Sequence, residues 1–290
     1  MKNTPRILLS LSLLLAFSQC DKTPENPVLA PYAETSLDAN AGNWKTYLLS
    51  NSSEIALPAP SSATSAEYKA EIAALKTQAA AISSQQREAA LAWGANGVLR
   101  WHEIARELAA NYSVPPNYNA DGTYPSPDPN NPGAYPRFPF CNPPYASRAF
   151  ALLAVAQYDA LVAAWHHKFL HNRLAPAKND NSVPTLLPAN DLPSYPSEDA
   201  VVAAASREVL KFLFPNEKTY LDAQSTEHKA SRLWAGANVQ SDLDAGEALG
   251  AAVAAKIIAY AKTDKMGAAN AQANFPALRA DATARGIATQ

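Results

Sequence analysis

Helical periodicity runs through most of this chain and is interrupted by stretches rich in proline. From Ser65 to Leu108, helix-favouring residues dominate, and Trp93, Trp101 and Leu108 recur at helical spacing. Proline is frequent from 115 to 144, where it removes backbone donors and fixes φ, so a regular helix is excluded there. No segment shows the period-two alternation that a β-sheet needs. We therefore predict an all-α helical bundle with long Pro-rich loops.

More helices are predicted after the first Pro-rich stretch. One runs from about Tyr145 to Leu170 and is rich in alanine, which lets neighbouring helices approach closely. Three more are predicted at about Glu198–Phe214, Glu217–Trp234 and Ser241–Lys262. Pro215 and Gly236 lie between these segments, where helix stop signals belong.

Composition sets the protein class. The chain has 290 residues, of which 48% are apolar and 17% are charged, and its formal net charge is −2. These values fit one globular domain, which we place at residues 41–290. A charge so near zero provides no basic surface for nucleic acid, so we predict no nucleic-acid partner. The segment 268–290 has no clear stop signal, and we expect the C-terminus to be truncated.

The N-terminus has the pattern of an export signal. Lys2 and Arg6 precede the apolar run Ile7–Phe17, as the charged and hydrophobic parts of a secretory signal do. We assign residues 1–19 to a signal peptide and predict an exported protein.

Cys20 follows this signal directly and resembles the lipidation site of a bacterial lipoprotein, although Gln19 departs from the usual small residue before the cysteine. We predict that residues 20–40 form a lipid-anchored tether, so that the membrane is a partner and the cell envelope is the location. The alternative is an ordinary cleaved signal with an incidental cysteine. Cys141 is then expected to be a buried, inert thiol.

Three short segments, far apart in the chain, carry residues suited to binding an anion. They are Lys168 with Arg173 and Pro176, Tyr195 to Ala200, and Ser231 to Asp242. In that order they resemble the signature K-x6-R-P, P-S-G-H and S-R-x5-H-x3-D of the type 2 phosphatidic acid phosphatase and vanadium-dependent haloperoxidase superfamily. The resemblance spans about Trp93 to Lys262 and implies the helical bundle of that superfamily.

The resemblance implies four anion-binding residues. Lys168 matches the lysine of the first motif, Ser197 the serine of the second, and Arg232 the arginine of the third. The arginine of the first motif is replaced by Ala175, and we expect the long side chain of Arg173 to compensate for it.

The same resemblance identifies three catalytic positions, and two of them lack the expected histidine. Asp199 stands at the general-acid position and Asn238 at the nucleophile position, whereas Asp242 keeps the carboxylate that orients the nucleophile. A carboxamide cannot form a phosphohistidine or bond to vanadium through a ring nitrogen. In addition, Glu198 and Asp199 bring negative charge to a site for anions.

We therefore predict an envelope member of the superfamily with an anion pocket for phosphate or vanadate and impaired chemistry. The partner would be a phosphate-like anion or a small-molecule substrate. If activity remains, the resemblance implies phosphoester hydrolysis or halide oxidation, and vanadate would be a cofactor only for the latter. The sequence does not decide between these reactions or establish that the chain is an enzyme.

Two other functions stay open. The chain is alternatively a non-catalytic surface lipoprotein that binds a ligand, or the anion pocket has become a divalent-cation site formed by Glu198, Asp199, Asn238 and Asp242. A purely structural role is a separate alternative: the retained Lys168, Ser197 and Arg232 would only cross-link helices, with Arg232 paired to Glu198, Asp199 or Asp242 and Asn238 hydrogen-bonded to Asp242.

The histidines offer no clear replacement for the missing ones. His166, His167 and His171 lie near a helix end, where a favourable interaction with the helix dipole explains them better than a metal does. His228 lies one turn before Arg232, but its helical position differs by about 40°. We predict no metal site at these histidines and no catalytic role for His228.

Overall fold

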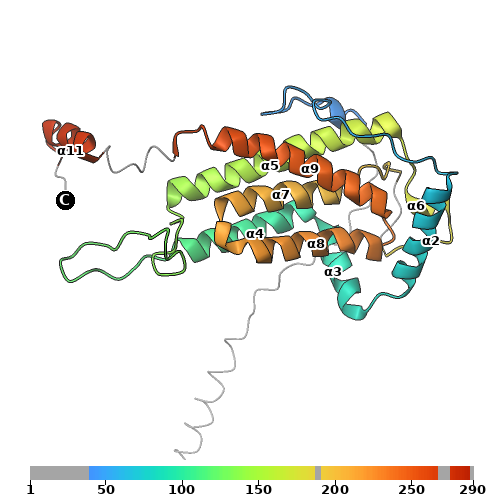
Figure 1. Cartoon of the computed structure of the whole chain (residues 1–290), viewed down its shortest axis with the longest axis horizontal. Helices are drawn as coiled ribbons and strands as arrows, with labels where there is room; N and C mark the ends of the chain where they lie inside the picture. The colour runs from blue at the N-terminus through green and yellow to red at the C-terminus, as the bar shows by residue number, and fades with distance from the viewer. Residues whose placement is uncertain (1–38, 187–190, 267–274, 288–290) are drawn as a thin grey trace, which may run out of the picture. The chain divides into compact units, whose positions relative to one another are not determined.

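The computed structural model describes residues 39–186, 191–266 and 275–287. Within these ranges every regular element is a helix, which confirms the predicted all-α class (Figure 1). The helices are η1 (Ala41–Asn43), α2 (Ala66–Ala80), α3 (Ser84–Ala95), α4 (Gly97–Tyr112), α5 (Pro143–His171), α6 (Pro176–Asn179), α7 (Glu198–Leu213), η2 (Pro215–Glu217), α8 (Lys218–Trp234), α9 (Gln240–Ala261) and α11 (Phe275–Ala284). The predicted signal peptide and the lipidation site at Cys20 lie outside the described residues.

Capping residues divide the helical region after Ser65 into three helices. Ser65 accepts a hydrogen bond from the backbone of Tyr68 and begins α2. Ser83 and Gln86 form a reciprocal capping box that begins α3, and Asn96 caps α4. Such side chains satisfy the orphan N–H groups of a first turn, so each one favours a new helix start.

α5 is the longest helix and lies in the core. It begins with Pro143 and Pro144 after the cap Asn142, and ends at Asn172 in the left-handed region. The stretch Pro143–Asn179 is long and apolar enough to cross a membrane, but 56% of its most apolar window is buried inside the protein. Because α5 packs against α7, α9 and α4, its apolar character is explained by core packing.

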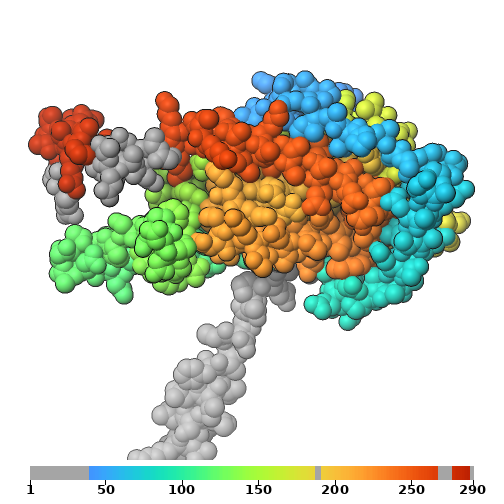
Figure 2. Space-filling view, in the orientation of Figure 1, coloured from blue at the N-terminus to red at the C-terminus, as the bar shows by residue number. Residues whose placement is uncertain are grey.

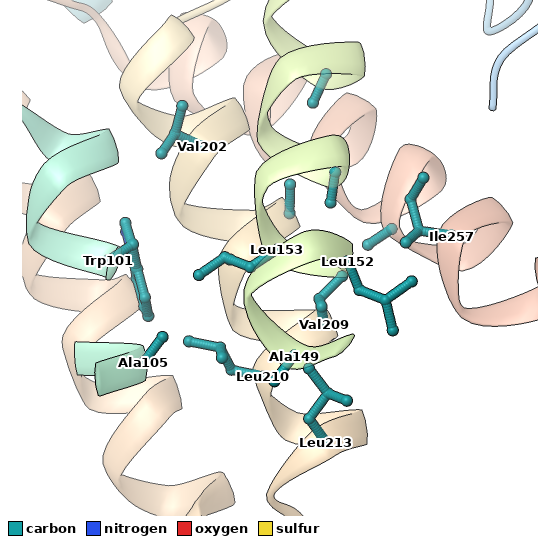
Figure 3. Close-up of a cluster of buried hydrophobic side chains, with 14 of the residues drawn as sticks. Trp101, Ala105, Ala149, Leu152, Leu153, Val202, Val209, Leu210, Leu213 and Ile257 are labelled. Carbon is teal, nitrogen blue, oxygen red and sulfur yellow. The ribbon is translucent and has the colours of Figure 1, made fainter. Parts of the chain in front are cut away.

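α7 and α9 pack closely because glycines face the contact. A Cβ atom at Gly250 would lie 2.3 Å from the carbonyl oxygen of Val201, and one at Gly246 would lie 2.4 Å from that of Ser197. Leucine, valine and alanine side chains of α5 and α7, together with Trp101 of α4 and Ile257 of α9, fill the space between these helices (Figure 3). Close packing of apolar side chains of this kind is the main stabilising term of such a bundle.

A buried carboxylate holds the segment before α2 against α5. Asp159 accepts hydrogen bonds from the backbone N–H groups of Tyr47, Leu48 and Leu49 at 2.8, 2.8 and 3.0 Å. The imidazole Nε2 of His167 lies 2.8 Å from the carbonyl oxygen of Ile55. In the space-filling view the blue segment from residue 39 onward lies directly against the helical body (Figure 2).

The Pro-rich stretch between α4 and α5 has no helix or strand, as predicted. The backbone N–H of Cys141 donates to the Tyr112 carbonyl at 2.8 Å and closes the base of this loop. Cys141 is buried, and burial raises the pKa of its thiol to about 11. The thiol is therefore protonated at neutral pH, as expected for an inert cysteine.

We predict that Gly250→Ala lowers the free energy of unfolding by about 2 kcal/mol, because the added methyl group meets backbone atoms of α7. Urea denaturation followed by circular dichroism measures this change. Gly133→Ala is the matched control, since a Cβ there meets nothing within 4 Å. Equal stability of the two variants would show that α7 and α9 do not need this close contact.

Candidate functional site

The three motif segments converge on one cavity of about 520 Å³, which we call the motif cavity. Its charged side chains are Lys168 in the last turn of α5, Glu198 and Asp199 in the first turn of α7, and Arg232 in the last turn of α8, and its amide side chains are Asn96, which caps α4, and Asn238 before α9. Its non-polar walls include Trp93, Val98, Leu161, Trp165 and Val202. The structure thus brings together side chains that the resemblance had assigned to one site.

Lys168 is nearly inaccessible, with 3% of its side chain exposed. Its Nζ donates a hydrogen bond to the carbonyl oxygen of Pro193 at 2.5 Å and lies 4.0 Å from Oε2 of Glu198. A buried ammonium group requires such partners, because leaving water is costly for a charge. Lys168 therefore carries one positive charge into the cavity wall, with Glu198 as the nearest negative charge.

Arg232 is the second buried cation of the cavity, and 4% of its side chain is exposed. Nη2 donates to the carbonyl oxygen of Ala90 at 2.9 Å, and Nε donates to Oγ of Ser231 at 3.0 Å. Nη1 lies 3.5 Å from Oδ2 of Asp199. The guanidinium is thus fixed by α3 and α8, and it is paired with one of the carboxylates that the sequence left as candidates.

His228 also contacts Asp199, and its two ring nitrogens are both engaged. Nε2 lies 3.1 Å from Oδ1 of Asp199, while Nε1 of Trp101 donates to Nδ1 at 3.1 Å. An indole nitrogen is only ever a donor, so Nδ1 must be the acceptor and the ring proton must be on Nε2. Trp93 stacks on the ring with centroids 4.3 Å apart, and Gly97 leaves room for it.

The ionisation states follow from this arrangement. Burial lowers the pKa of His228, and the Asp199 carboxylate offsets only part of that effect. Burial alone raises the pKa of Asp199, but the Arg232 charge and the His228 hydrogen bond outweigh it and hold that pKa well below its usual range. At neutral pH His228 is therefore neutral and Asp199 is ionised.

Asn238, at the nucleophile position, is held by hydrogen bonds on both ends of its amide. Oδ1 accepts from Oγ of Ser197 at 3.2 Å, and Nδ2 donates to the carbonyl oxygen of Ser194 at 3.1 Å and to Oδ2 of Asp242 at 3.4 Å. The expected contact between Asn238 and Asp242 is confirmed. Ser197 itself does not line the cavity, and it caps α7 by accepting from the backbone of Ala200 at 3.3 Å.

Arg173 and Asp242 form an ion pair that does not line the motif cavity. Nε of Arg173 donates to Oδ1 of Asp242 at 3.1 Å, and its guanidinium lies between the rings of Tyr68 and Tyr195. Asp242 also accepts from the backbone N–H of Val239 at 3.0 Å, which caps α9. Arg173 is therefore placed to neutralise Asp242, and it does not take over the place of the arginine that Ala175 replaces.

The proposed divalent-cation site finds no support in this geometry. Among the residues that the structure describes, no group of three His, Cys, Asp or Glu side chains is arranged to hold a metal ion. Glu198, Asp199 and Asp242 each have a different cationic partner within 4.0 Å. The stacked pair His167 and His171 also lacks a third ligand of this kind.

The groups that hold Lys168, Arg232 and His228 in place could not be predicted from the sequence. The carbonyl oxygens of Pro193 and Ala90 are backbone atoms, and no motif marks them. The sequence marks Trp93 and Trp101 only by their helical spacing, and nothing in that spacing indicates that one stacks on His228 and the other donates to it. A histidine one turn before a motif arginine was the single available signal.

We predict that His228 is neutral at pH 7 with its proton on Nε2. Because burial lowers its pKa, we also expect the ring to gain a second proton only at a pH below 6.5, the ordinary pKa of histidine. Nitrogen-15 chemical shifts of labelled histidine, assigned with a His228→Gln variant, measure both the tautomer and the titration. A proton on Nδ1, or a cationic ring at pH 7, would contradict the hydrogen-bond assignment.

Comparison with solved structures identifies the fold. The chain is similar to a bacterial vanadium-dependent iodoperoxidase (TM-score 0.58, 18% identity, 79% of this chain and 59% of that one). It is also similar to the apo form of a bacterial vanadium-dependent chloroperoxidase (0.59, 15%, 78% and 56%) and to the holo form (0.59, 15%, 83% and 60%). The sequence matches no protein-family model and no curated protein.

The chain spans between 56% and 60% of the length of these solved structures. Their names describe halide-oxidising activities of those proteins, and at such low identity the likeness concerns the fold. The chain therefore has the helical fold of the vanadium-dependent haloperoxidases, as the three motifs predict.

Proposed function

We propose that this protein is an envelope-anchored binding protein that holds a phosphate-like anion in the motif cavity and does not convert it chemically. One observation carries the proposal: two buried cations remain at the cavity, whereas the nucleophile position is a carboxamide engaged at both ends. Lys168 and Arg232 supply the cations, and Asn238 is the carboxamide.

Two buried cations support anion binding. Charge-assisted hydrogen bonds from an ammonium and a guanidinium group are the usual means of holding a phosphate. Both side chains are almost completely buried, which strengthens their interaction with a ligand in the same cavity. Glu198 and Asp199 oppose them, so the affinity for a simple phosphate is expected to be weak, on the order of 1 mM.

Neither His228 nor Asp199 is placed to act as a nucleophile or a general acid. The imidazole of His228 uses one nitrogen to donate to Asp199 and the other to accept from Trp101. Asp199 has a pKa far below neutral, so it holds no proton to give to a leaving group. The two histidines of the superfamily signature are therefore not replaced in function by His228 or Asp199.

Vanadate does not fit this site as a resident cofactor. The resemblance implies a bond from a ring nitrogen to vanadium, but position 238 offers only an amide whose Nδ2 donates to Ser194 and Asp242. Nδ1 of His228 already accepts from Trp101. An oxyanion is therefore proposed as a reversibly bound ligand.

The envelope location rests on the N-terminal sequence. The charged and apolar residues before Cys20 favour export, and the cysteine at their end favours attachment of lipid. A lipid-anchored tether of residues 20–40 would place the helical domain beside the membrane.

We expect inorganic phosphate to raise the melting temperature of the purified full-length protein without turnover of p-nitrophenyl phosphate, or of bromide with peroxide and vanadate. Lys168→Met should weaken phosphate binding about tenfold, because it removes one charge-assisted contact. Lys256→Met is the control, since Lys256 is exposed and does not line the cavity.

Turnover that disappears in Lys168→Met would contradict the non-catalytic part of the proposal. An unchanged melting temperature at high phosphate concentration would contradict the anion-binding part.

We further expect Cys20→Ser to abolish incorporation of labelled palmitate in a bacterial host and to move the protein from the membrane fraction to the soluble fraction. Cys141→Ser is the matched control and should keep the label, because Cys141 is buried in the folded domain. Labelling of the Cys20→Ser protein would contradict lipid attachment at this residue.

A further inference from the structure

Positive and negative side chains are present in equal number at the motif cavity. Lys168 and Arg232 are balanced by Glu198 and Asp199, and all four line the same space. Building on the function proposed above, we propose that the ligand is a small zwitterion: an amino-alcohol phosphate, in which a short carbon chain joins a phosphate to an ammonium group. Its phosphate would lie at the two cations, and its ammonium group at the two carboxylates.

The spacing of the ion pairs supports this assignment. Lys168 Nζ and Glu198 Oε2 are 4.0 Å apart, and Arg232 Nη1 and Asp199 Oδ2 are 3.5 Å apart. Charge-assisted hydrogen bonds are typically about 2.7–2.9 Å, so both pairs are looser than a direct bond. The tight pair of the same region, Arg173 with Asp242, does not line the cavity. The two loose pairs, in contrast, are formed by side chains that line the cavity, where a ligand can contact them.

Electrostatics separates a zwitterion from a simple anion. A phosphate without a cation gains from Lys168 and Arg232 but is repelled by the carboxylates of α7. Asp199 stays ionised at neutral pH because the Arg232 charge and His228 outweigh its burial. The ammonium group of a zwitterionic ligand is attracted by the same carboxylates. Each charged side chain of the cavity then has an oppositely charged ligand group as a partner.

The walls of the cavity suit a short alkyl link and an ammonium group. Val98, Leu161 and Val202 line it with apolar surface, and the half-buried Trp165 adds an aromatic ring. An ammonium group near an indole face is stabilised by cation–π attraction. A cavity of about 520 Å³ lies in the range of small-molecule sites and is large enough for such a ligand.

Calorimetric titration of the purified full-length protein tests the proposal with four probes. They are phosphoethanolamine, ethyl phosphate, ethanolamine and glycerophosphoethanolamine. We expect phosphoethanolamine to bind at least about tenfold more tightly than ethyl phosphate, which lacks only the ammonium group, because that group gains a charge-assisted contact. Ethanolamine should bind more weakly than phosphoethanolamine. Binding of the glycerol diester as well would identify a lipid head group as the source, and its exclusion would identify a free monoester.

Glu198→Gln tests the residue that carries the preference. We expect the ratio between phosphoethanolamine and ethyl phosphate to fall toward one, with ethyl phosphate binding more tightly than in the unmodified protein. Glu208→Gln is the matched control on α7, because Glu208 pairs with Arg207 and does not line the cavity. Circular dichroism verifies that both variants are folded, and Asp199→Asn replaces Glu198→Gln if the latter is not.

The outcomes distinguish this proposal from the one on which it rests. Equal affinity for phosphoethanolamine and ethyl phosphate, with both lost in Lys168→Met, overturns the zwitterion and leaves the anion-binding function intact. Absence of binding by every phosphate probe overturns both. A preference for phosphoethanolamine that persists in Glu198→Gln and in Asp199→Asn also overturns the assignment, because the carboxylates would then not be its cause.

Discussion

The close approach of α7 to α9 is the constraint on which the motif cavity depends. The carbonyl oxygen of Ser197 approaches Gly246 so closely that a Cβ atom at position 246 would collide with it. In addition, the backbone N–H of Ser197 donates to the carbonyl oxygen of Asp242 at 2.9 Å. The first turns of the two helices are thereby held together. Glu198 and Asp199 follow Ser197 directly, so this contact also determines where their carboxylates enter the cavity.

Burial of the charged groups then decides how they are paired. Each buried cation of the site has a carboxylate within 4.0 Å: Lys168 has Glu198, Arg232 has Asp199 and Arg173 has Asp242. An isolated buried charge would cost several kcal/mol, so the carboxylates stabilise a cation-rich site without a bound ligand. The same compensation weakens the attraction for a simple oxyanion. Stability and anion affinity therefore oppose each other in this cavity.

The sequence predicted helix bounds and the convergence of the motifs better than it predicted the contacts within the site. Stop signals such as Pro215 and Gly236 are local, and α7, α8 and α9 each end within one residue of the predicted position. Partners are not local. Arg173 was expected at the anion but pairs with Asp242, and His228 contacts Asp199 because Trp101 of α4 fixes the ring. A helical angle of about 40° between His228 and Arg232 did not separate them, since both reach Asp199.

The side chains at positions 199 and 238, where the superfamily signature has histidines, are held by neighbouring polar groups. The amide of Asn238 has a donor end and an acceptor end, and both are used by Ser194 and Ser197 of the segment before α7 and by Asp242 of α9. Asp242, which the resemblance placed as the carboxylate that orients the nucleophile, is neutralised by Arg173 and accepts from the backbone N–H of Val239 at the start of α9. A buried carboxylate without these partners would be costly. Arg173 therefore supplies the positive charge that a buried carboxylate at position 242 needs, and this ion pair helps to hold α9 against the segment after α5.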